Sequence, residues 1–214
     1  MKQLMGLSQR PLLLAAALTL FVMADVAHAQ ARVDCSRRIS PGVGFSAGRS
    51  LTPYVELSPQ LVDGRPGASV LPRGGLYLAG RLDLPIAGPW RGRVEVSGAN
   101  WRLEQNRYGD DSQLIATDTV GQIEAREIVA LVGRQGGRAP CGYVLAGGAL
   151  YSLDVGRVRV RRTGVALTAG IEVPVAGRGA LQLDAQVHMI SAAAGHPFAG
   201  ALAANISIGW SHRF

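Results

Sequence analysis

The chain has 214 residues, of which 48% are hydrophobic and only 17% are charged, below the roughly 25% usual in soluble domains. It holds no internal apolar run of the about 18 residues that a transmembrane helix needs. Composition therefore excludes both a disordered chain and a helical membrane protein, and leaves room for one or two domains. The formal net charge is +7, which suits anionic lipid headgroups or saccharide phosphates as partners.

The N-terminus has the pattern of a secretory signal. Lys2 and Arg10 precede the apolar run 11–23, and the small-residue site Ala27-His28-Ala29 follows it. We therefore predict a cleaved signal peptide over residues 1–29. An N-terminal membrane anchor is the alternative, but the run is short for a span. An exported chain is not expected to bind nucleic acid.

Beyond about residue 50 the apolar residues recur at every second position, which is the pattern of β-strands. In residues 75–86, for example, leucines and Ile86 occupy one face and Arg81 and Asp83 the other. We expect a tail over 30–50 and a β domain over 51–214. The eight predicted strands are 51–62, 75–86, 91–103, 122–133, 142–153, 162–175, 179–190 and 201–214.

The fourth predicted strand has an irregular charge pattern. Glu124 and Arg126 share one face, whereas Glu127 falls on the other. Either a β-bulge intervenes, or Glu127 lies near a rim.

Alternation alone does not distinguish a soluble sandwich from a membrane barrel, but the connections do. Short links (87–90 and 176–178) contrast with the long polar stretch 104–121, as in outer-membrane barrels. We also expect two thin girdles of interfacial aromatic residues, made of Trp90, Tyr143, Trp210 and Phe214 at the short-turn end and Trp101 and Tyr151 at the other.

The last strand ends in Gly209-Trp210-Ser211-His212-Arg213-Phe214. This ending resembles the closing strand of bacterial outer-membrane β-barrel proteins, with His212 where tyrosine is more usual, and the alternation resembles the small OmpA and OmpW groups. The resemblance implies an all-β fold, an eight-stranded antiparallel transmembrane barrel in the outer membrane. It also implies that the barrel-assembly machinery recognises Gly209, Trp210, His212 and Phe214. We expect a monomer whose partners are outer-membrane lipids and lipopolysaccharide.

Two cysteines, Cys35 and Cys141, remain after the signal. In an exported protein an even pair suggests a disulfide. With eight strands and both termini in the periplasm, both residues fall on the periplasmic side, so the bond would staple the tail across the rim. Two free thiols are the alternative.

The polar faces of the strands should fill the narrow interior of an eight-stranded barrel. We predict an interior charge network, since unpaired charges there would be unstable. Its members are Arg81, Asp83, Arg91, Arg93, Glu95, Glu172 and Asp184.

Four arginines follow the fifth strand, in a link expected to be extracellular. Guanidinium groups suit phosphate, so these residues are candidates for lipopolysaccharide contact; a solvated loop is the equal alternative. They are Arg157, Arg159, Arg161 and Arg162.

No catalytic residue, metal site or cofactor is predicted. A lipid-modifying barrel enzyme would need a serine two residues after a histidine on one face; Ser191 instead lies three residues after His188. The leading function is therefore a structural or surface-interaction role in the envelope, without enzyme activity. The alternatives are a small-molecule conduit of the OmpW type, a lipid-modifying enzyme and a soluble periplasmic binder; the charged inner faces argue against the conduit.

Overall fold

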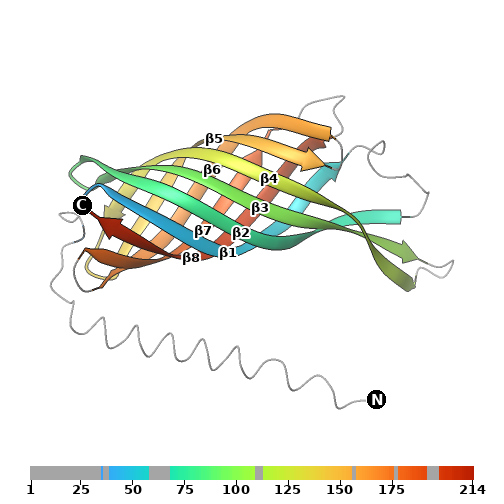
Figure 1. Ribbon diagram of the computed structural model, residues 1–214, viewed down its shortest axis with the longest axis horizontal. Helices are drawn as coiled ribbons and strands as arrows, with labels where there is room; N and C mark the ends of the chain where they lie inside the picture. The colour runs from blue at the N-terminus through green and yellow to red at the C-terminus, as the bar shows by residue number, and fades with distance from the viewer. Residues whose placement is uncertain are drawn as a thin grey trace, which may run out of the picture.

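The computed structural model describes Cys35 and residues 39–57, 68–108, 113–155, 158–175, 178–191 and 198–214. The predicted signal peptide, residues 1–29, lies outside the described residues. In the described part, eight antiparallel strands pair with their chain neighbours, and β8 pairs with β1 to close the barrel (Figure 1). The predicted eight-stranded barrel is confirmed. No helix among these residues is long and apolar enough to cross a membrane.

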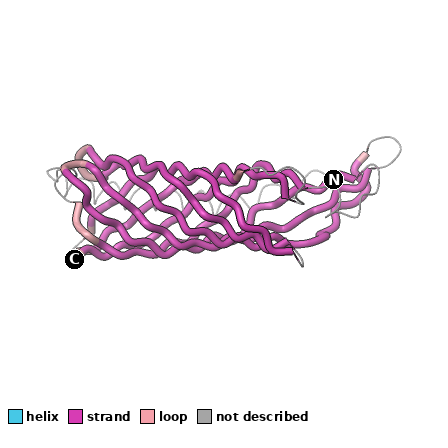
Figure 2. Tube along the Cα trace, turned by 90° about the horizontal axis from the view of Figure 1, so that it is seen from above, coloured by secondary structure: helices cyan, strands magenta, loops and turns pink. Residues whose placement is uncertain are grey.

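The strands that form the barrel wall are tilted relative to the barrel axis, as Figure 2 shows. Strands that are neighbours in sequence are also neighbours in the sheet. The β2–β3 link is a tight turn in which Gly88 has a φ of 53°, a left-handed conformation that glycine adopts readily. The strands are β1 (Gly42–Leu57), β2 (Ala68–Ala87), β3 (Trp90–Tyr108), β4 (Leu114–Gly136), β5 (Cys141–Val155), β6 (Val158–Pro174), β7 (Gly179–Ile190) and β8 (Phe198–Arg213).

The barrel begins at Gly42, so the predicted boundary at residue 51 is wrong, as are the bounds 51–62 of the first strand. The tail before the barrel therefore ends at residue 41. Val43, Phe45 and Ala47 point outward on β1, but the inward positions are glycines and serines. Small inward residues leave little contrast in polarity, which hides the alternation from a sequence reading.

The outer wall carries an apolar band. On β4 the outward positions between Arg126 and Arg134 are Ile128, Ala130 and Val132. At about 3.3 Å per residue and a tilt of about 40°, the two arginines are about 20 Å apart along the barrel axis, close to the height of a membrane-facing band. The other large apolar residues exposed on the wall include Leu76, Leu78, Val94, Val96, Val144, Leu150, Val165, Leu167, Leu183, Val187, Ile206 and Ile208.

Glu127 lies inside this wall and not at a rim, and the pairing of β4 runs past it without a bulge. The residues that deviate are instead Glu124 and Arg126, which are exposed on the outer surface beyond the apolar band. Charged side chains are stable there because this part of the wall lies outside the hydrocarbon layer of the membrane.

The stretch 104–121, predicted as a loop, is largely strand. β3 and β4 stay paired as far as Tyr108 and Leu114, whereas β5 joins β4 only from Ile123 onward. β2 continues beside β3 to Ala68. We call this three-stranded extension the blade: residues 68–75 of β2, 102–108 of β3 and 114–122 of β4. Figure 1 shows β3 and β4 running past the ends of β5 and β6. Both faces of the blade lack an apolar alternation, so the sequence pattern resembled a loop.

A charge placed in the apolar band tests the position of the membrane. V165R should lower the free energy of unfolding by about 2–4 kcal/mol, because the arginine would face lipid near the middle of the band. T119R, on the blade, should leave it unchanged. Urea titrations in lipid vesicles measure both; equal effects of the two variants would contradict the assignment of the band.

Candidate functional site

The inward faces of β2, β3 and β7 bring arginines and carboxylates together in the half of the interior next to the short turns, the end that faces the periplasm in outer-membrane barrels. Arg81 Nη1 lies 2.5 Å from Asp184 Oδ2, and Arg93 bridges two carboxylates, at 2.8 Å from Asp83 and 3.4 Å from Asp184. All four side chains are buried. Arg81 can lie flat on the wall because Gly209 is opposite, where a Cβ would be 2.5 Å from Arg81 Nη2.

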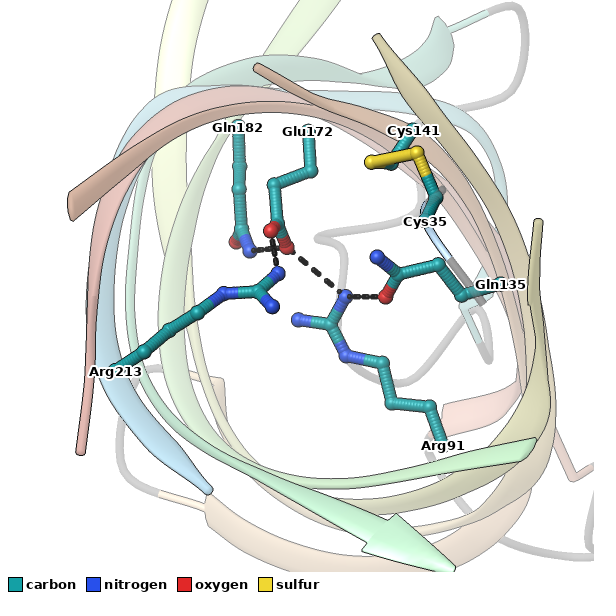
Figure 3. The surroundings of a disulfide bond; sticks show 7 residues. All are labelled: Cys35, Arg91, Gln135, Cys141, Glu172, Gln182 and Arg213. Atoms are coloured by element: carbon teal, nitrogen blue, oxygen red, sulfur yellow. Dashed lines mark hydrogen bonds and ion pairs between the residues drawn. A yellow bond between two sulfur atoms is a disulfide. The ribbon is translucent and has the colours of Figure 1, made fainter. Parts of the chain in front are cut away.

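The network continues to the periplasmic mouth through Arg91. Its guanidinium lies 2.5 Å from Asp83 and 3.1 Å from Glu172, and it donates a 2.8 Å hydrogen bond to Gln135 Oε1. Glu172 also forms an ion pair with Arg213 and accepts a hydrogen bond from Gln182 Nε2. Five side chains therefore meet across the mouth (Figure 3): Arg91, Gln135, Glu172, Gln182 and Arg213. Sequence reasoning did not include Arg213, Gln135 or Gln182, although the alternation of each strand places them inward.

Tyr143 lies inside this network, so its predicted place in the interfacial aromatic girdle at the short-turn end is wrong. The guanidinium carbons of Arg91 and Arg93 are each 5.0 Å from the centre of its ring, and its hydroxyl bonds Asp184. Trp101 and Tyr151 are likewise buried in the interior. The prediction that these two residues form an interfacial girdle at the outer end is therefore wrong. A buried aromatic ring with a polar tip stabilises cations as well as apolar neighbours.

Glu95 is the last member of the predicted network, and its carboxylate accepts a hydrogen bond from the uncharged hydroxyl of Tyr77. The Tyr77 hydroxyl lies 2.6 Å from Glu95 Oε1 and 3.0 Å from Gln186 Oε1. The structure thus places all seven predicted residues in the buried interior.

A second polar cluster surrounds His188 at mid-height. Its Nδ1 lies 2.9 Å from the Tyr151 hydroxyl and its Nε2 3.1 Å from the Asn205 amide, while the Ser97 hydroxyl donates to Glu127 at 3.0 Å. Glu127 Oε2 is 3.7 Å from His188 Nδ1. Every member is buried, and most of the polar atoms are hydrogen-bonded within the cluster, whereas Glu127 Oε1 and Asn205 Oδ1 have no hydrogen-bond partner among the described residues.

The outer half of the interior is apolar. Trp101, Leu103, Ile123, Leu153 and Ile190 are buried there, and the Trp101 indole donates a 2.7 Å hydrogen bond to the Ser50 hydroxyl. The expectation of charged inner faces therefore holds only for the periplasmic half. Among the described residues no group of three or more His, Cys, Asp or Glu side chains is arranged to hold a metal ion.

Cys35 and Cys141 form a disulfide at the periplasmic mouth, on the same side of the barrel opening as Gln135 in the view of Figure 3. The Cys35 N–H also donates a 3.2 Å hydrogen bond to the carbonyl of Gly137, and the Phe214 N–H donates to the carbonyl of Pro41. The tail is thus fixed to both the β4–β5 link and the C-terminus.

The described arginines of the set predicted after β5 do not form one cluster. Arg157 lies outside the described residues. Arg159 forms a bidentate ion pair with Asp154, with hydrogen bonds of 2.6 and 3.1 Å. This hydrogen bonding lowers the pKa of the Asp154 carboxyl below its ordinary value. Arg161 is exposed on the outer wall, and Arg162 Nη1 bonds the carbonyl of Arg161.

The residues of the C-terminal motif lie on β8 at the closing seam. Trp210, His212 and Phe214 are exposed on the outer face, with the His212 and Phe214 rings edge to face at 6.1 Å between centres. Gly209 faces inward over Arg81. The motif thus presents an outward aromatic row at this end of β8, and its recognition by the barrel-assembly machinery stays a prediction.

No protein-family model matches the chain, and no curated protein is similar enough in sequence to count as a relative. The fold is similar to outer membrane protein OprG from Pseudomonas aeruginosa (9% identity, TM-score 0.52, covering 82% of this chain and 97% of that one). It is also similar to Neisserial surface protein A (13%, 0.54, 81% and 97%) and to outer membrane protein AlkL (12%, 0.50, 82% and 90%).

These likenesses show the fold of small bacterial outer-membrane β-barrel proteins. Together with the apolar band on the closed wall, that fold places the chain in a bacterial outer membrane. The alternative of a soluble periplasmic binder is wrong, because a soluble barrel would turn its polar faces outward.

Removing one carboxylate of the interior network tests its contribution. D184N keeps the volume of the side chain but leaves Arg81 without its 2.5 Å partner, and should lower the free energy of unfolding by about 3–5 kcal/mol. The matched control D154N removes an Asp–Arg pair at the surface and should leave the urea midpoint unchanged. Equal midpoints for the two variants would show that the buried network is not stabilising.

Reducing the disulfide should also destabilise the barrel. The two cysteines are 106 residues apart in sequence, and closing so long a loop in the unfolded chain contributes about 4–5 kcal/mol. Urea unfolding with and without reductant measures the change. The C35S/C141S variant should match the reduced protein and be indifferent to reductant; a wild-type protein that is equally indifferent would contradict the prediction.

Proposed function

We propose that this protein is a non-enzymatic surface-interaction barrel, whose blade binds an extended segment of another polypeptide by adding it as a strand to the β4 edge. The observation that carries the proposal is the difference in strand length. β4 has 23 residues, whereas β5 has 15 and joins it only at Ile123.

The outer end of β4 has one paired edge and one open edge. From Leu114 to Thr117 it pairs with β3, and no described strand lies against its other side. Backbone N–H and C=O groups on such an edge are a template for another strand. Strand addition uses these groups for affinity and the neighbouring side chains for selectivity.

Apolar residues lie at this edge, above the membrane band. Leu114 and Ile115 have 56% and 72% of their surface exposed. Outside the hydrocarbon such exposure has no lipid to cover it, and exposed apolar groups next to an open edge are typical of a protein contact.

The blade is held rigid by contacts between its strands. Arg73 on β2 bonds Glu104 on β3 at 2.9 Å, and the Thr117 hydroxyl on β4 donates to Asn106 on β3 at 2.9 Å. A rigid edge loses little conformational entropy when it binds a partner.

The interior supports this role better than the alternatives. Trp101, Ile123 and Leu153 are fully buried and fill the outer half of the barrel, which favours a closed barrel over a conduit. The polar clusters that could resemble catalytic groups are enclosed by the wall, which disfavours a lipid-modifying enzyme.

A proline on the open edge tests strand addition. Neighbouring residues of a strand point their N–H groups to opposite edges, so one of the variants A116P and T117P removes an N–H from the open edge, and the other breaks a β3–β4 hydrogen bond. The probe is reduced, carboxymethylated α-lactalbumin, an extended chain, and native α-lactalbumin is its folded control.

We expect the purified barrel in micelles to bind the extended probe and not the folded one, as measured by fluorescence anisotropy. The edge-directed proline should weaken binding about fivefold to tenfold without lowering the melting temperature, because a lost hydrogen bond is worth about 1 kcal/mol. Equal binding of the native and extended probes, or wild-type binding by both variants, would reject the proposal.

A further inference from the structure

At the outer boundary of the apolar band, the outer surface has a groove of about 840 Å³ on β3, β4, β5 and β6. Its outward-facing lining, which we call the rim groove, combines two arginines with a row of apolar side chains. These residues are Val96, Arg126, Ile128, Leu150, Ser152, Arg161 and Thr163.

The strand register arranges the rim groove in two rows. Arg126, Ser152 and Arg161 are paired in register across three neighbouring strands. Since neighbouring strands are about 4.8 Å apart, the two arginine backbones are about 10 Å apart, with only a serine side chain between them. Two guanidinium groups can therefore approach one phosphate from opposite sides, with the Ser152 hydroxyl beneath it.

The row on the membrane side is mainly apolar. Val96 pairs with Ile128, Ile128 with Leu150 and Leu150 with Thr163, at the next outward position, two residues below the arginines. The lining of the groove thus changes from cationic to apolar between two successive outward positions of the strands, at the boundary of the apolar band. A ligand that matches it carries a phosphate close to its acyl chains within one amphipathic molecule.

The neighbouring charges favour an anion. Asp154 is engaged by Arg159, and Glu124 Oε2 lies 3.9 Å from Arg126 Nη2 with both side chains more than half exposed. Arg162 lines the end of the groove, held to the carbonyl of Arg161. Four arginines and two outward carboxylates, with Glu127 buried behind the wall, leave the rim positive, and arginine binds phosphate with two parallel hydrogen bonds.

We propose that the rim groove binds the phosphorylated disaccharide of lipid A in the outer leaflet, with Arg126 and Arg161 on a phosphate and Val96, Ile128 and Leu150 against its acyl chains. This site differs from the arginine set expected from the sequence. Arg161 belongs to both sets, whereas Arg126 comes from β4 and is not in the predicted set. Arg159 is not part of the site because it is paired with Asp154. The site does not depend on strand addition at the blade.

Titration of the folded barrel in detergent with purified lipid A, followed by native mass spectrometry, tests the site. The wild-type protein should bind one lipid A, and R126Q/R161Q should bind it at least about tenfold more weakly, because each charged hydrogen bond contributes about 1.5–3 kcal/mol. The control R134Q/R178Q removes two exposed arginines from the periplasmic end and should bind as the wild type does. Heat-modifiable gel mobility checks that every variant is folded.

A second variant separates the groove from charge alone. S152W keeps both arginines but fills the space between them, and should lose lipid A binding to a similar extent. Dephosphorylated lipid A and phosphatidylglycerol should bind at least about tenfold more weakly than lipid A, and inorganic phosphate should not displace it. The proposal is overturned if R126Q/R161Q or S152W binds lipid A as tightly as the wild type, or if the periplasmic control loses as much. Equal binding of either comparison lipid, or displacement by phosphate, also overturns it.

Discussion

The closure of the sheet between β8 and β1 is the constraint on which the rest of this structure depends. Hydrocarbon offers no hydrogen-bond partner, so every backbone N–H and C=O within the apolar band must be paired along the wall. The seam achieves this from Gly42 opposite Arg213 to Leu51 opposite Ala204. Beyond the band water solvates the backbone, and there β3 and β4 continue without β5. The same requirement that closes the barrel therefore allows an open edge at its outer end.

Closure also decides the character of the interior. A wall that turns its apolar side chains to lipid must enclose the others, and eight strands leave no room for bulk water. Arginine and carboxylate side chains in the periplasmic half are consequently bonded to one another, and the Tyr143 ring lies against both Arg91 and Arg93. Toward the outer half the enclosed residues become apolar around Trp101. The disulfide and Arg213 complete the network at the mouth, where the tail meets the wall.

The two proposed activities use different surfaces of the outer end, each a consequence of where the wall leaves the membrane. At the rim, outward residues change from apolar to cationic within one step, which suits a phosphorylated lipid. Farther out, β4 loses its second neighbour, which suits an extended polypeptide. A lipid at the rim and a strand on the blade would not compete, since Arg126 and Arg161 are on the wall and Leu114 and Ile115 at the end of the extension.

The sequence by itself determined the fold class, the number of strands and which residues of β2 and β7 face inward, because alternating polarity reports directly on the two sides of a wall. It also placed Cys35 and Cys141 at one end of the barrel, since strand parity decides the side of each link. Only the tertiary structure decided that β1 begins at Gly42 and that 104–121 forms strands, because neither segment has an apolar alternation. It alone showed that Tyr143, Trp101 and Tyr151 are interior and that Arg126 and Arg161 share a row. Register between strands joins residues far apart in the chain, and no local pattern records it.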